Sequence, residues 1–142
     1  MISGYTFSAG LICVSVIDFL GRFYFGQCQR RRDTKCRFIS WLLKYTGSSF
    51  DFDLADKFYT DFRNGLVHEC RIKNGGEFSL NISNLKEERN GGKHLAINPK
   101  ILLEEIKNGF KKYLEDLKRD SILFKRLRDC LMTDFKEDFS KD

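Results

Sequence analysis

The sequence has few helix breakers and no closely paired cysteines. It contains one proline and 11 glycines among 142 residues, so long stretches can form helices and an all-β sandwich is disfavoured. Its five cysteines are an odd, scattered set without a CxxC pair, which is typical of a reducing compartment and predicts a cytoplasmic protein. His68 and Cys70 lack the second pair of ligands that a zinc site requires, so neither a metal nor another cofactor is predicted.

The sequence does contain enough apolar material for one core. Hydrophobic residues make up 42% of it, including 14 Phe, 5 Tyr and 1 Trp. A chain of this length buries roughly two thirds of its unfolded surface, so residues 1–142 are predicted to form a single domain without covalent cross-links. The 25 Lys and Arg residues outnumber the 20 Asp and Glu residues, for a net charge of +5. With so many aromatic residues, disorder of the whole chain is excluded.

The most apolar stretch, residues 11–25, has the composition of a signal peptide or a membrane span. No Lys or Arg precedes it, it is shorter than the roughly 20 residues of a span, and Asp18 and Arg22 interrupt it one helical turn apart. We therefore expect no membrane insertion, and predict a buried helix over residues 8–25 with Ser8 as its N-cap. Because its apolar positions nearly encircle it, this helix is expected at the centre of a bundle or against a partner chain.

Apolar periodicity predicts four further helices and one hairpin. The helices are expected over residues 33–45, 53–69, 98–117 and 121–135. Alternating apolar residues over 78–82 and 95–97 predict two strands, joined by a polar connection over 86–93. The fold class is therefore mainly α: a helical bundle of about five helices with a small β-hairpin insertion.

The predicted helix over residues 53–69 carries the most informative polar residues. Asn64 and His68 are four residues apart and so share a face, and Arg63 beside them can reach the same volume. Gly65 lies in the middle of this set, where it costs about 1 kcal/mol against alanine. Its presence predicts either a close backbone approach or a distorted helix at this point.

These three side chains have the chemistry for cleaving RNA without a metal. A histidine that titrates near neutrality can take a proton from a ribose 2′-hydroxyl or give one to the leaving 5′-oxygen. The guanidinium of Arg63 can neutralise the pentacoordinate phosphate, and Asn64 can position His68 or the phosphate. One histidine does not easily serve as both acid and base, whereas two copies facing each other across a dimer axis can.

The element Arg63-Asn64-x-x-x-His68 resembles the R-x4-6-H signature of HEPN domains, in which a polar residue often follows the arginine. The resemblance covers most of the chain and is closest to small stand-alone bacterial members. It implies a HEPN-like bundle, a symmetric homodimer with both motifs at the interface, and metal-independent endoribonuclease activity that leaves 2′,3′-cyclic phosphates. Many members act as toxins or in phage defence, some with a nucleotidyltransferase antitoxin. The pattern recurs over residues 89–94, but Gly91-Gly92 predicts a turn that cannot hold catalytic side chains.

Other interpretations of the same residues stay open. Asn64 and His68 can form a helix-end pair, with Arg63 in a salt bridge to Asp61 or Glu69. A basic run of Arg30, Arg31 and Arg32 is the densest positive segment and is predicted to bind RNA phosphates, although such a run is more often a solvated loop. The alternatives to an enzyme are a catalytically inactive HEPN-like RNA-binding or dimerisation module, and a helical partner-binding protein unrelated to RNA.

Overall fold

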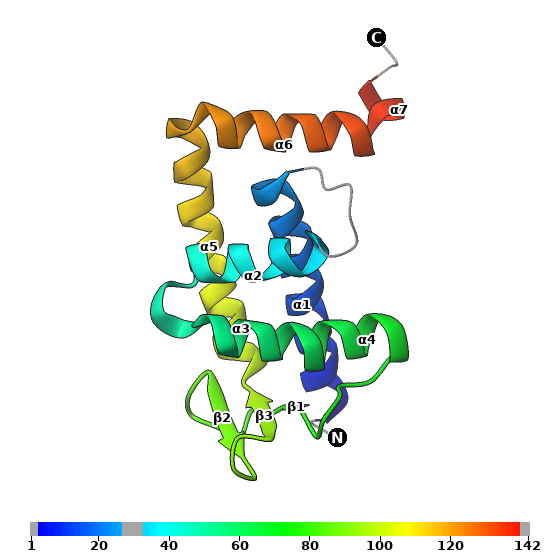
Figure 1. The fold of residues 1–142 in the computed structure, drawn as a ribbon, viewed down its shortest axis with the longest axis vertical. Coiled ribbons are helices and arrows are strands. Elements are labelled where there is room, and N and C mark those ends of the chain that lie inside the picture. Colours follow the sequence, from blue (N-terminus) through cyan, green and yellow to red (C-terminus); the bar gives the residue numbers. More distant parts are fainter. Residues whose placement is uncertain (1–2, 27–32, 140–142) are drawn as a thin grey trace.

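A computed structural model describes residues 3–26 and 33–139 of the chain. It is mainly helical, with a small three-stranded sheet at one end, which confirms the predicted mainly α class (Figure 1). Helix α1 (Ser3–Phe25) occupies the centre and packs against α2 (Asp33–Tyr45), α5 (Pro99–Arg119) and α6 (Ser121–Asp134). In Figure 1, α2 and the helical segment over residues 52–69 cross α1 and α5. Helix α6 lies across the end opposite the sheet.

Helix α1 is longer than predicted. It begins at Ser3, so the prediction of Ser8 as its N-cap is wrong. Ser8 lies inside the helix, where its hydroxyl donates to the Gly4 carbonyl oxygen at 3.0 Å. The expectation that this segment is too short for a membrane span is therefore wrong. Residues Gly4–Phe25 are long and apolar enough to cross a membrane by length and composition, and 39% of the most apolar window is buried inside the protein.

Helices α2 and α5 follow their predicted starts. Asn98 caps α5, since its side-chain oxygen accepts from the Lys100 and Ile101 backbone amides, and Pro99 occupies the first turn. Between α1 and α2 the backbones come very close: a Cβ at Gly21 would lie 2.7 Å from the Arg37 carbonyl oxygen. This crossing places Arg37 directly on α1. A short 3-10 turn (η1, Gly47–Ser49) follows α2, and α7 (Lys136–Phe139) follows α6.

The predicted helix over residues 53–69 is present but contains a π-helical turn. It consists of α3 (Phe52–Phe58), the π-helix η2 (Tyr59–Arg63) and α4 (Asn64–Glu69). Its apolar side chains recur every four residues. In an α-helix, a step of four residues turns the side chain about 40° past a full turn, so a long four-residue repeat would drift around the helix. A wider π turn offsets that advance, so all four members of the repeat stay buried: Leu54, Phe58, Phe62 and Leu66.

The sheet differs from the predicted hairpin. Its strands are β1 (Glu77–Phe78), β2 (Lys86–Arg89) and β3 (His94–Ile97), with β1 parallel and β2 antiparallel to β3. The hairpin partner of β3 is thus the polar segment expected to be a connection. Its charges form exposed ion pairs, such as that of Lys86 Nζ with Glu88 Oε1 at 3.0 Å, so no apolar alternation marks this edge strand.

The turn between β2 and β3 is confirmed. Asn90, Gly91 and Gly92 all have positive φ angles, from 54° to 83°. The second copy of the arginine–histidine pattern therefore spans a hairpin turn. Its Arg89 is in ion pairs with Glu77 and Glu87.

Candidate functional site

Arg63 is held on three sides at the end of the π turn. Its Nη2 donates to Asp18 Oδ2 of α1 at 2.9 Å, and its Nη1 donates to Asn64 Oδ1 at 3.4 Å. Its guanidinium carbon lies 5.5 Å from the centroid of the Tyr59 ring, within cation–π range. The side chain is only 13% exposed. The structure thus brings Arg63 and Asn64 together and fixes the arginine in one orientation.

The π turn accounts for the position of this arginine. The Asn64 amide donates to the Tyr59 carbonyl oxygen, a five-residue step that widens the helix just before the motif. Burial of the Tyr59 ring raises the pKa of its hydroxyl, although nearby Arg63 opposes this shift. Tyr59 is therefore a neutral phenol at neutral pH and presents an uncharged aromatic wall to the guanidinium.

Gly65 is where the chain after α4 returns against the motif helix. Helix α4 ends at Glu69, and the next residue, Cys70, has a left-handed φ of 54°. A Cβ at Gly65 would lie 2.3 Å from the Arg71 carbonyl oxygen. Both features predicted from Gly65, a close backbone approach and a distorted helix, are confirmed.

A buried carboxylate ties the returning segment to the π turn. Asp61 is 2% exposed. Its side chain accepts from Asn74 Nδ2 at 2.7 Å and lies 3.0 Å from Lys57 Nζ, and its carbonyl oxygen accepts from the Lys73 amide at 2.8 Å. The Asp61 carboxylate therefore joins the π turn to the segment after α4, and it does not form an ion pair with Arg63.

His68 is less constrained than its neighbours. It lies in the last turn of α4, is exposed, and forms no hydrogen bond or ion pair in the described part of the chain. Asn64 and His68 are one turn apart on α4, on the stripe next to that of Arg63 and Val67. The site therefore has a fixed arginine and asparagine beside a solvent-accessible histidine.

The alternative salt bridges of Arg63 are not formed. Glu69 pairs with Arg71 and Lys73. The partner of Arg63 is Asp18, 45 residues earlier. The one sequence signal for Asp18 was its position as the only acidic residue within the apolar helix α1, which sequence reasoning used only to argue against a membrane span.

A cavity of about 300 Å³ opens beside Arg63. It is formed by α1, α2, the π turn and α4, and its polar lining includes Asp18, Arg22, Arg37 and Arg63. In the sequence, Arg22 counted only against a membrane span, and Arg37 follows the basic run of Arg30, Arg31 and Arg32 at a distance of five residues. The predicted RNA-binding residues Arg30, Arg31 and Arg32 lie outside the described residues.

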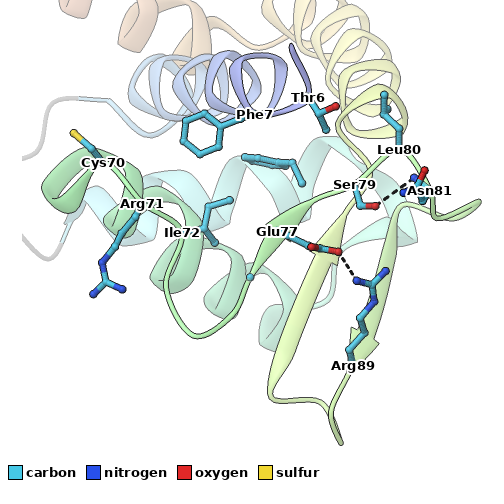
Figure 2. A pocket seen from close by; sticks show the side chains of 12 residues that line it. Thr6, Phe7, Cys70, Arg71, Ile72, Glu77, Ser79, Leu80, Asn81 and Arg89 are labelled. Atoms are coloured by element: carbon cyan, nitrogen blue, oxygen red, sulfur yellow. Dashed lines mark hydrogen bonds and ion pairs between the residues drawn. The ribbon is translucent and has the colours of Figure 1, made fainter. Parts of the chain in front are cut away.

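A larger cavity of about 600 Å³ lies between the start of α1, the segment after α4 and strand β1 (Figure 2). Its two arginines are already paired: Arg71 with Glu69, and Arg89 with Glu77 and Glu87. Figure 2 shows the contact between Glu77 and Arg89 at the sheet. This cavity therefore has no uncompensated arginine for an anionic ligand.

Among the described residues, no group of three or more His, Cys, Asp and Glu side chains is arranged to hold a metal ion. Comparison of the chain with protein-family models, with curated proteins and with solved structures gives no match. The function is therefore argued from the side chains of this site.

Proposed function

We propose that this chain is a HEPN-like endoribonuclease that acts as a homodimer and cleaves RNA without a metal ion. The observation that carries the proposal is the anchoring of Arg63. A nearly buried guanidinium, fixed by Asp18, Asn64 and Tyr59 next to an open cavity, is the arrangement that stabilises a developing phosphate charge. The exposed His68, one turn from Asn64, supplies a group that can exchange protons with substrate.

In the proposed reaction, the substrate supplies its own nucleophile. His68 takes the proton of a ribose 2′-hydroxyl, and that oxygen attacks the adjacent phosphorus. The bond to the 5′-oxygen breaks, and His68 of the partner subunit gives this leaving oxygen a proton. The products are a 2′,3′-cyclic phosphate and a free 5′-hydroxyl, with Arg63 neutralising the phosphorane between the two steps.

An exposed apolar surface beside the cavity supports the homodimer. On α1, Ile12 is 60% exposed and Phe19 is 53% exposed, and on α4 Val67 is 55% exposed. Phe19 and Val67 line the cavity itself. A second copy packed on this surface would bury apolar side chains and bring two Arg63–His68 sets together across the symmetry axis.

The remaining parts of the proposal follow from the RNA substrate. Arg30, Arg31 and Arg32 would add phosphate contacts that are independent of sequence. The resemblance to HEPN proteins makes a toxin or phage-defence role, with a nucleotidyltransferase antitoxin as partner, the biological setting we propose. The protein would then act in the cytoplasm.

One observation favours a second candidate, a HEPN-like RNA-binding or dimerisation module without turnover. The charge of Arg63 is compensated by Asp18 in the structure, and no contact joins His68 to Arg63 within the described residues. A module would need neither group for chemistry, so the two candidates differ in what the loss of His68 does.

Cleavage assays on mixed RNA in EDTA separate the two candidates. For the enzyme, His68→Ala should lower the rate at least about 10²-fold with little change in RNA affinity. Arg63→Lys should also lose cleavage, because the point charge of a lysine does not reproduce the forked donors of the guanidinium. His94→Ala, in the second copy of the pattern, is the matched control and should cleave normally. If the wild type cleaves no RNA and the His68 and Arg63 variants bind RNA as it does, the module is the correct function.

A further inference from the structure

The cavity beside Arg63 carries more positive than negative charge. Of its three arginines, Arg22 is paired with Asp134 and Arg63 with Asp18. Arg37 has no carboxylate partner among the described residues. Its one hydrogen bond there runs from Nη2 to Thr34 Oγ1 at 3.3 Å. One uncompensated guanidinium therefore remains at this cavity.

Two of the arginines that line this cavity also have a buried donor without an acceptor. The Nε atoms of Arg37 and Arg63 are both buried, and neither makes a hydrogen bond within the described residues. Buried donors of charged groups are normally satisfied, because leaving them unpaired is costly. The two arginines come from different helices and both line the cavity, so an anion there can accept from Arg37 and still lie beside Arg63.

The backbone of Arg37 and the guanidinium of Arg63 are both held in place before any ligand arrives. The backbone of Arg37 is packed on Gly21 of α1, where even a Cβ would be too close to its carbonyl oxygen. Arg63 is fixed by the π turn and by Asp18. Preorganised donors lose little freedom on binding, which favours affinity for a small anion.

We propose that this cavity binds a phosphate group of the RNA backbone next to the scissile one, and that Arg37 is its principal ligand. Phosphate fits because its oxygens match the forked donors of a guanidinium. The choice of RNA as the source of the phosphate rests on the proposed function. Arg37 is then a binding residue that sets the register of the strand, while Arg63 acts at the neighbouring, reacting phosphate.

The test uses an RNA oligonucleotide with 2′-O-methyl groups throughout, which cannot be cleaved. Its affinity is measured by fluorescence anisotropy over a range of salt concentrations for wild type, Arg37→Gln and Arg128→Gln. Arg128 is the matched control, since its side chain is 59% exposed on α6. We expect Arg37→Gln to weaken binding at least about fivefold and to reduce the slope of log affinity against log salt by about 0.7, the value for one phosphate contact on a single strand. Equal affinity and slope for the two variants would overturn the proposal.

A second measurement needs no variant and covers a failure of Arg37→Gln to fold. Arginine Hε resonances of the wild-type protein are followed by NMR while inorganic phosphate is added at constant ionic strength. Those of Arg37 and Arg63 should shift, and that of Arg128 should not. Absence of a shift at Arg37 overturns the proposal.

The outcomes also separate this proposal from the proposed function. Binding of the 2′-O-methyl RNA that depends on Arg37, without cleavage of ordinary RNA, supports the phosphate site and rejects the enzyme. Phosphate shifts without any RNA binding reject RNA as the source and, with it, the proposed function. Normal cleavage by Arg37→Gln with unchanged RNA affinity rejects the site alone.

Discussion

Replacing Gly65 by alanine tests the packing that positions the site. The new Cβ would lie 2.3 Å from the Arg71 carbonyl oxygen and 3.2 Å from the Lys73 amide nitrogen, both of them backbone atoms. These atoms cannot rotate away, so the segment after α4 has to move by about 1 Å to reach ordinary contact. Overpacking of this kind costs about 1–3 kcal/mol, and the better helix propensity of alanine offsets about 1 kcal/mol.

We therefore expect Gly65→Ala to lower the free energy of unfolding by up to about 2 kcal/mol. For a chain of this size that is a fall in Tm of up to roughly 7 °C, measured by circular dichroism. Gly4→Ala is the control, because Gly4 is also helical and nothing lies within 4 Å of its added Cβ. That variant should be as stable as the wild type or slightly more stable. A Gly65→Ala protein with the same Tm as the Gly4→Ala protein would refute the close approach.

Three further predictions concern the anchoring of Arg63, the apolar surface and a buried thiol. Asp18→Asn removes the charge that holds Arg63, so RNA should bind more tightly while cleavage slows; unchanged cleavage would show that Asp18 does not position the arginine. Ile12→Glu should convert the dimer to a monomer in light scattering, whereas Phe110→Glu, at an apolar exposed position of α5, should not; a wild-type monomer at tens of micromolar contradicts the dimer. Burial raises the pKa of the Cys13 thiol from 9.0 to about 11. The stability that the neutral thiol contributes is therefore full below pH 9.0 and is lost as pH rises toward 11. Between these two pH values, the free energy of unfolding in urea should fall less for Cys13→Ala than for the wild type.

Much of the helical fold could be predicted because its apolar periodicity is long and regular. The C-terminal end of α2 and the N-cap of α5 follow from local residues, namely Gly47 after α2 and Asn98-Pro99 before α5. The sheet could not be predicted in the same way. Strand β2 is charged and exposed, and its pairing with β3 depends on the turn at residues 90–93 and on long-range contacts.

The candidate site was predictable only as a set of residues on one helix. Spacing identified Arg63, Asn64 and His68, and Gly65 signalled the close packing. The π turn was encoded in the four-residue apolar repeat, which departs from the 3.6-residue period of an α-helix. The contacts of Arg63 with Asp18 and the proximity of Arg37 depend on how α1, α2 and α4 cross, and no local pattern specifies such crossings.

The most direct test of the central claim is cleavage of a DNA oligonucleotide that contains a single ribonucleotide, in EDTA. If the ribose 2′-hydroxyl is the nucleophile and Arg63 and His68 drive the reaction, the wild type cuts only on the 3′ side of that ribonucleotide. Mass spectrometry should then find a 2′,3′-cyclic phosphate on the upstream fragment, and the all-DNA strand should stay intact. Cleavage at deoxyribonucleotides, or a product ending in a linear phosphate from the start of the reaction, would contradict the account.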